Sequence, residues 1–165
     1  MNTRPDPATD ASAAQESPTH RYLEPGAITR RLFNPLMAGL VKLGIGVKGA
    51  RILEVKGRVS GEWRSVPVNP LTLGEHRYLV ASRGRTQWVR NLRHAGGGRL
   101  RTGRRVEEFV ATELADADKP EVVRAYLEEW AWEVGAFFEG ITKDSSDAEL
   151  LDVVDGFPVF EITPT

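Results

Sequence analysis

Apolar and polar residues alternate along residues 51–56, where apolar side chains such as Val55 stand beside charged ones such as Glu54. A period of two is typical of a β-strand with one covered face. Further strands are predicted at 66–73, at 78–82, as a pair over 100–114 that turns at Gly103, and at 158–162. Pro67 and Pro70 each lack an amide donor, so the strand that contains them is restricted to edge or bulged pairing.

A different period, close to four residues, marks residues 25–43. Apolar residues such as Ile28 and Leu32 recur there on one face, which predicts a helix, and Pro35 breaks or kinks it. One interpretation packs this helix across the end of a β-domain. The alternative lays it on a membrane surface, with its basic residues facing the lipid headgroups.

The remaining helices begin at recognisable caps. Thr86 can cap a helix that the glycines 96–98 end. Pro120, with an acidic first turn, starts a longer helix over 119–140, and Tyr126 and Trp130 lie within its apolar stripe. A short helix is predicted over 146–153. Antiparallel hairpins with flanking helices indicate an α+β fold of about six strands, in which a small closed barrel would remove bare sheet edges.

The 165 residues fit one globular domain over 20–165, preceded by a tail over 1–19 that has too few apolar residues to become ordered. Cysteine is absent, which excludes disulfides, thiolate metal sites and a cysteine nucleophile. The three histidines are far apart, so no metal site is predicted. With no run of about 18 apolar residues and no secretion signal at the start, we expect a cytoplasmic protein, with contact to a membrane surface through the helix over 25–43 as the open alternative.

Charge is distributed unevenly along the chain. Residues 1–106 hold 19 of the 22 Lys and Arg residues but only 7 of the 23 Asp and Glu residues, so the two parts should attract once folded. Eight arginines fall between Arg83 and Arg105. Such a cluster can bind nucleic acid, but it lacks the interleaved Phe or Tyr on which single-stranded bases stack, so nucleic acid is the weaker alternative.

Residues 52–91 combine three strands with glycine turns, and arginines stand at or beside two of these turns. Turn amides and guanidinium groups are donors of fixed direction that suit anions. The ligand is therefore expected to carry phosphate or carboxylate groups. For Arg58 and Arg64 themselves, a solvated hairpin charge remains an equal alternative.

Several short motifs occur in a characteristic order. They are Gly57-Arg58-x-Ser60-Gly61-x-x-Arg64-x-x-Pro67, Ala81-Ser82-Arg83-Gly84, Trp88-x-x-Asn91-Leu92 and Pro158-Val159-Phe160. From about residue 28 to residue 162, this order resembles the deazaflavin-dependent nitroreductase and quinone reductase family. The resemblance implies a split β-barrel that binds the deazaflavin coenzyme F-420, a small-molecule hydride acceptor such as a quinone or nitroaromatic, and a homodimer as one assembly.

The resemblance also assigns roles by position. Arg58, Ser60 and Arg64 would hold the phosphate and the oligoglutamate tail, and Pro67 would line the ring. Ser82, Arg83 and Gly84 would contact the phosphate or the ring. Gly61, Trp88 and Asn91 complete the coenzyme set, and Ser82 is also a candidate catalytic residue. Tyr126 is the second catalytic candidate; it has no clear counterpart in the family and is named because it lies in the apolar stripe of the helix over 119–140, which faces the sheet.

Two departures from the family pattern keep alternatives open. Val59 stands where the family commonly has Lys, and the loop between Arg83 and Gln87 is shorter than usual. A barrel of this kind could instead bind FMN, another flavin, haem or a fatty acid without turnover. Tyr126 has two interpretations, since aromatic residues at helical spacing are more often core than catalytic.

Overall fold

A computed structural model describes residues 49–165. The predicted tail over 1–19 and the predicted helix over 25–43, with its suggested membrane contact, lie outside the described residues. The single domain over 20–165 stays a prediction. Within the described part of the chain, no helix combines the length and the apolar character that crossing a bilayer requires.

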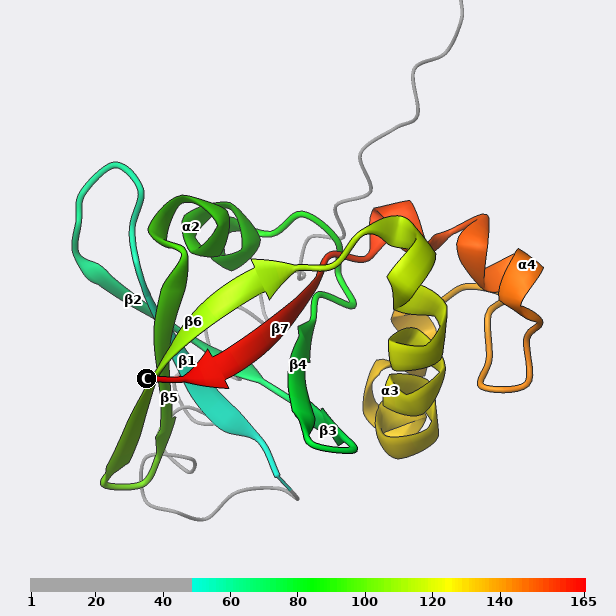
Figure 1. The fold of residues 1–165 in the computed structure, drawn as a ribbon, viewed down its shortest axis with the longest axis horizontal. Coiled ribbons are helices and arrows are strands. Elements are labelled where there is room, and N and C mark those ends of the chain that lie inside the picture. The colour runs from blue at the N-terminus through cyan, green and yellow to red at the C-terminus, as the bar shows by residue number, and fades with distance from the viewer. Residues whose placement is uncertain (1–48) are drawn as a thin grey trace, which may run out of the picture.

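One antiparallel sheet forms the body of the protein (Figure 1). Its strands are β1 (Arg51–Lys56), β2 (Trp63–Val68), β3 (Pro70–Leu73), β4 (His76–Val80), β5 (Gly97–Thr102), β6 (Arg105–Glu113) and β7 (Val159–Pro164), in the spatial order β2-β1-β5-β6-β7-β4-β3. The α+β split-barrel fold is confirmed, with seven strands where about six were predicted. The predicted strand over 66–73 is in fact two strands.

The break falls at Asn69, which is buried between β2 and β3. Before it, Pro67 lies opposite Ile52 of β1, and after it, Pro70 lies opposite Leu79 of β4. The chain therefore passes from one edge strand of the sheet to the other through a single residue. The two edges must then lie close together, so the sheet curls into the half-barrel seen in Figure 1. Both prolines occupy edge strands, as their missing donors require.

Within residues 49–165, three α-helices flank the barrel: α2 (Gln87–Ala95), α3 (Lys119–Val134) and α4 (Asp147–Leu151). The helix α2 follows Thr86 and ends at Gly96, whose φ of 68° is left-handed, as the sequence indicated. The next two glycines do not extend the helix end, because they begin β5. The helix α3 stops short of the predicted residue 140 and continues as the 3-10 turn η2 (Gly135–Phe137).

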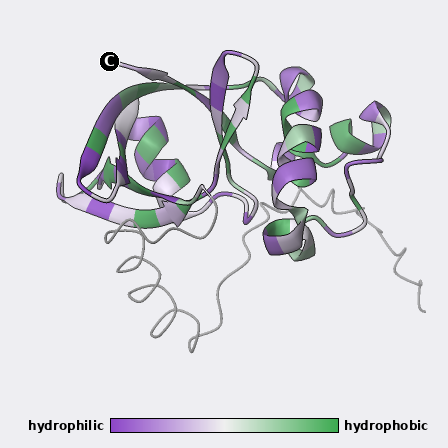
Figure 2. Ribbon diagram, turned by 90° about the horizontal axis from the view of Figure 1, so that it is seen from below, coloured by the Kyte–Doolittle hydropathy of each residue, from purple (hydrophilic) through white to green (hydrophobic). Residues whose placement is uncertain are grey.

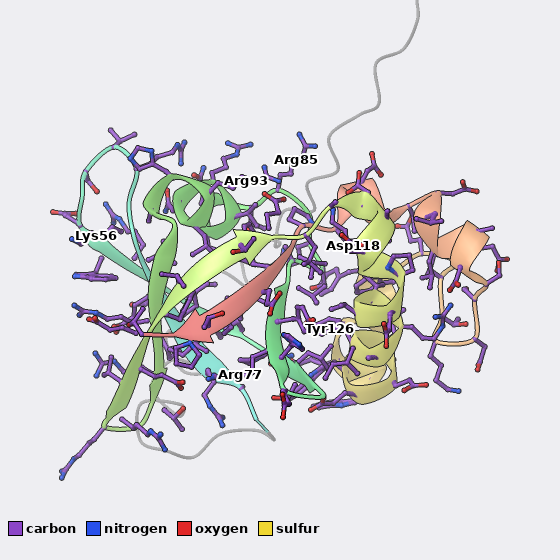
Figure 3. The ribbon with its side chains drawn as sticks, in the orientation of Figure 1. Lys56, Arg77, Arg85, Arg93, Asp118 and Tyr126 are labelled. Atoms are coloured by element: carbon purple, nitrogen blue, oxygen red, sulfur yellow. The ribbon has the colours of Figure 1, made fainter. Side chains whose placement is uncertain are left out.

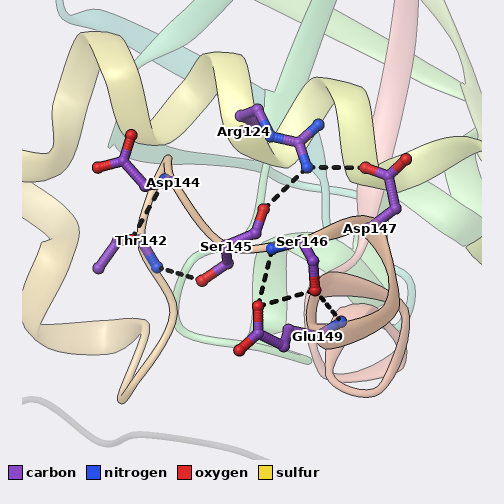
Figure 4. Close-up of polar contacts among 7 residues, drawn as sticks. All are labelled: Arg124, Thr142, Asp144, Ser145, Ser146, Asp147 and Glu149. Atoms are coloured by element: carbon purple, nitrogen blue, oxygen red, sulfur yellow. Dashed lines mark hydrogen bonds and ion pairs between the residues drawn. The ribbon is translucent and has the colours of Figure 1, made fainter.

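Two further 3-10 turns, η1 (Asp116–Asp118) and η3 (Val154–Gly156), lie before α3 and after α4. The short helix α4 is held by a capping box, in which Ser146 and Glu149 satisfy each other's backbone amides. Arg124 of α3 donates to the Ser145 carbonyl oxygen at 2.9 Å and to Asp147 at 2.7 Å (Figure 4). This contact joins the segment before α4 to the middle of α3.

Among the described residues, most of the core lies in two clusters, and Ala50 and Ile52 form a small third one. Inside the curl, α2 lies across the opening that the strands enclose (Figure 2), and Leu92 packs with Phe109 and Phe160. Outside it, α3 packs on the β3–β4 side, where Tyr126 and its neighbours meet residues of α4 and the following turn. The end of β4 contributes to both clusters, because Val80 belongs to the outer one and Leu79 and Ala81 belong to the inner one.

Candidate functional site

The hairpin between β1 and β2 closes on glycines. The Gly57 amide donates to the Glu62 carbonyl oxygen at 2.8 Å, and the Gly61 amide donates to the Gly57 carbonyl oxygen at 2.8 Å. Gly61 has a φ of 69°, and a Cβ on Gly57 would lie 2.9 Å from Ser60 Oγ. The left-handed φ favours glycine at position 61, and at position 57 a Cβ would force Ser60 to move. The turn presents Arg58 at the rim of the barrel.

Arg58 is fastened to α2. Its backbone amide donates to Asn91 Oδ1 at 3.3 Å, while its guanidinium donates to Asn91 Oδ1 at 3.2 Å and to Gln87 Oε1 at 3.0 Å. The structure thus brings together Arg58 and Asn91, which the sequence named separately. It adds Gln87, which sequence reasoning missed. The signal was present, because Gln87 lies one helical turn before Asn91 and shares its face.

The charge of Arg58 is not neutralised within the described residues, since both its side-chain partners are neutral amides. Arg64, in contrast, lies 3.1 Å from Glu62, with both side chains largely exposed. Arg58 is consequently the stronger candidate for binding an anion. Arg64 contributes a charge that its own neighbour in the hairpin partly offsets.

The start of α2 adds further donors beside Arg58. Thr86 occupies the N-cap position, but its side chain makes no capping bond, and its buried Oγ1 has no hydrogen-bond partner in the structure as described. The first turn carries no acidic residue, so its backbone amides and the helix dipole favour an anion at this end. A buried hydroxyl without a partner beside an uncompensated guanidinium fits an oxyanion ligand.

Ser82 and Tyr126 meet at the border between β4 and α3. Ser82 follows Ala81, whose amide donates to the Pro158 carbonyl oxygen at 2.8 Å, and the Ser82 side chain hydrogen-bonds with Tyr126. Tyr126 is 2% exposed and lies between the sheet and α3 (Figure 3). Burial raises the pKa of the Tyr126 hydroxyl, the charges of Glu133 and Glu129 raise it further, and the hydrogen bond with Ser82 opposes the shift. The hydroxyl is therefore neutral at ordinary pH and a weaker acid than a free tyrosine.

The other predicted residues are placed around these two groups. Arg83 lies 5.3 Å from the ring centre of Phe137, a cation–π contact that the sequence did not indicate. Gly84 is buried with a φ of 75°, and its amide donates to the Ala81 carbonyl oxygen. Trp88 packs against Phe160, with ring centres 6.0 Å apart. Trp88 is therefore partly a core residue.

Three of the eight arginines in the cluster between Arg83 and Arg105 form ion pairs with glutamates of β1 and β6. Arg93 binds Glu113 through two nitrogens at 2.7 and 2.6 Å, and Arg101 binds Glu54 at 2.9 and 3.2 Å. Arg99 pairs with Glu108 at 3.0 Å and stacks on Trp63. The pairs of Arg93 and Arg99 join the basic and acidic parts of the sequence, as their charges suggested, whereas the pair of Arg101 with Glu54 lies within the basic part. They also leave fewer arginines to bind phosphates, which weakens the nucleic-acid alternative.

Solved structures with this fold agree with the observed architecture. A structure described as an F420-H2 dependent reductase (FDR-A) is 18% identical, with a TM-score of 0.51, over 70% of this chain and 95% of its own. A structure described as a domain-swapped dimer is 18% identical, with a TM-score of 0.50, over 78% of this chain and 91% of its own. A protein of unknown function from Agrobacterium tumefaciens is 10% identical, with a TM-score of 0.52, over 76% and 52%.

No curated protein sequence matches the chain. The sequence profile of one family does match, over residues 34–135. That span runs through the hairpin with Arg58, the turn with Ser82, the helix α2 and the part of α3 that carries Tyr126. The matching profile describes F420H(2)-dependent quinone reductases, and because it covers more than half of the sequence, this chain belongs to the F420H(2)-dependent quinone reductase family.

Proposed function

We propose that this protein transfers a hydride from the reduced deazaflavin coenzyme F-420 to a quinone, a nitroaromatic or a similar unsaturated acceptor. The observation that carries the proposal is the position of Arg58. Its guanidinium faces neutral amides at the N-terminal end of α2, beside the buried Thr86 hydroxyl. An anionic coenzyme tail would supply the acceptors that these donors lack.

The donor set fits such a tail. Guanidinium groups grip phosphate and carboxylate through parallel donors, and the first amides of α2 add directed donors with a favourable dipole. Arg58 and Arg64 would bind the tail, with Ser60 and Gly61 shaping the hairpin that carries them. Ser82, Arg83 and Gly84 would lie toward the ring, and Pro67 would line it from β2. Trp88 and Asn91 would support this rim from α2, with Asn91 holding Arg58 in place.

Reduced deazaflavin, when bound, supplies a hydride to an acceptor. The chain must then orient the acceptor, exclude water and provide a proton. Tyr126 is assigned the last task because its hydroxyl is neutral and its hydrogen bond with Ser82 fixes the direction of the oxygen. The raised pKa makes this hydroxyl a weaker acid than a free tyrosine, so its proton would leave only as negative charge develops on the acceptor. Hydride plus proton completes the two-electron reduction of a quinone. Ser82 is less buried than Tyr126 and can pass a replacement proton from solvent.

Fluorescence titration with F-420 and with FMN tests the coenzyme assignment. Because the tail of F-420 carries carboxylates beyond its phosphate, we expect it to bind more tightly than FMN. Arg58→Gln should weaken F-420 binding about ten-fold or more, since a charge-assisted pair is lost. Arg104→Gln, in the exposed turn between β5 and β6, is the matched control and should leave binding unchanged. Equal or tighter binding of FMN would contradict the assignment.

Turnover separates the enzyme from a non-catalytic binding module. Oxidation of reduced F-420 should accelerate when protein and a simple quinone are present together. Tight coenzyme binding without such acceleration would favour the module. The homodimer also stays a prediction, supported by the similar chain described as a domain-swapped dimer, and sedimentation equilibrium checks it.

A further inference from the structure

A second polar groove lies at the other end of the barrel from Ser82. It has a volume of about 490 Å³, and its lining includes Arg51, Thr72, Arg77, Thr102, Arg105 and Glu107. Arg77 is near the start of β4 and Ser82 follows its end, which separates them by about 17 Å at the usual rise of a strand. Figure 3 shows Arg77 and Arg85 at opposite ends of this part of the barrel. The groove is therefore distinct from the proposed coenzyme site.

The groove holds more positive charge than its carboxylates neutralise. Arg77 is paired with Glu107 at 2.6 Å. Among residues 49–165, Arg51 donates only to the carbonyl oxygens of Gly49 and Ala50, at 2.8 and 3.1 Å. Arg105 makes no ion pair or hydrogen bond with any side chain of the described residues. Arg51 and Arg105 thus line the groove without a carboxylate partner in the part of the chain that the structure describes.

Glu129 and Trp130 of α3 complete the wall and affect the charge in opposite ways. The Glu129 carboxylate lowers the positive potential on one side. Trp130 is 2% exposed, and its buried Nε1 has no acceptor in the described part of the chain. This nitrogen is below the groove surface, so we assign it no direct contact with a ligand. Its unsatisfied N–H still favours negative charge nearby, because a buried donor without a partner is strongly polarising.

We propose that this groove binds a small organic oxyanion, with a carboxylate or phosphate group held between Arg51 and Arg105. The hydroxyls of Thr72 and Thr102 are suited to donate to the same group. Guanidinium groups match the planar or tetrahedral oxygens of such anions. The volume accommodates a small metabolite. The proposal does not depend on the function assigned to the coenzyme site.

Citrate and inorganic phosphate are suitable probes, with sodium chloride at equal ionic strength as the control. Two-dimensional ¹H–¹⁵N spectra resolve the indole groups of the four tryptophans. We expect the Trp130 resonance to shift in a saturable way, while Trp63, beside Arg99 at the β1–β2 hairpin, stays unchanged. Citrate binding more tightly than phosphate would identify the carboxylate as the preferred group, and the reverse order would identify phosphate.

Two neighbouring arginines provide matched variants. Arg104, in the turn between β5 and β6, and Arg105, the first residue of β6, are both exposed. Neither forms an ion pair within residues 49–165, but only Arg105 lines the groove. Arg105→Gln should weaken binding of the preferred probe about ten-fold or more, while Arg104→Gln should not. Equal losses in both variants, or shifts no larger than those with chloride, would overturn the proposal. Because F-420 is absent from this experiment, its outcome is independent of the coenzyme titration.

Discussion

Tyr126→Phe removes one oxygen atom from the hydrogen-bonded pair that the proposed chemistry uses. The ring of residue 126 still packs against Phe138, since the two ring centres lie 6.3 Å apart, so the packing of α3 on the sheet should be kept. Ser82, which is partly exposed, can exchange its lost partner for water. We therefore expect a modest loss of stability, about 1 kcal/mol, the usual net contribution of one hydrogen bond.

Ser82→Ala removes the same hydrogen bond from the other side, with a different expected cost. The Tyr126 hydroxyl would remain buried without a partner, and an unsatisfied buried polar group costs about 1–3 kcal/mol. The larger loss should thus fall on the serine variant. Urea unfolding of both single variants and of the double variant gives a double-mutant cycle, which measures the coupling energy between Ser82 and Tyr126. A loss that is equal or larger for Tyr126→Phe would contradict the burial of this hydroxyl.

Activity then distinguishes a catalytic tyrosine from a core tyrosine. If the hydroxyl donates its proton to the acceptor, Tyr126→Phe should lower turnover with a quinone about ten-fold or more, the lower range for a lost acid group. Coenzyme affinity should stay unchanged, because the proposed tail contacts lie at Arg58 and Arg64. Full turnover by Tyr126→Phe would refute the catalytic role and leave solvent or Ser82 as the proton source.

Three further predictions concern stability. Burial raises the pKa of Tyr126 above the unfolded value near 10, so the neutral hydroxyl stabilises the fold below pH 10 and this contribution falls as the pH rises further. Between pH 9 and pH 11, the free energy of unfolding should therefore decline less in Tyr126→Phe than in the unchanged protein. Ser146→Ala removes the capping box of α4 and should cost about 1 kcal/mol in urea unfolding, whereas no change would mean that the cap is dispensable. Gly98→Ala would place a Cβ 2.7 Å from the Glu54 carbonyl oxygen and 3.2 Å from the Phe109 ring, so we expect a loss of about 1–3 kcal/mol or more in stability. Gly135→Ala is the control and should be tolerated, because no atom would lie closer than 3.9 Å to its Cβ. Similar melting temperatures for both variants would contradict the packing of β5 on β1.

Local patterns in the sequence predicted the elements whose limits depend on nearby residues. Alternation over 51–56 matches β1, and the Thr86 and Gly96 boundaries match α2. Pro67 and Pro70 correctly indicated edge strands, since a missing donor excludes a central position. The same residues concealed the break at Asn69, because two short strands with one residue between them have the periodicity of a single strand. Which partner each half pairs with depends on the far side of the sheet.

The candidate site divides in the same way. The sequence alone placed arginines and glycines at the hairpin turns and predicted an anionic ligand, because donors and turn geometry are local properties. Only the tertiary structure joined Arg58 to Gln87 and Asn91, and Ser82 to Tyr126. It also paired Arg93, Arg99 and Arg101 with carboxylates, and within residues 49–165 it gave none to Arg58 and Arg105. Which arginine meets a carboxylate depends on the order of the strands in the sheet, which brings together residues that are far apart in the sequence. The local periodicity of apolar and polar residues therefore cannot predict these pairs.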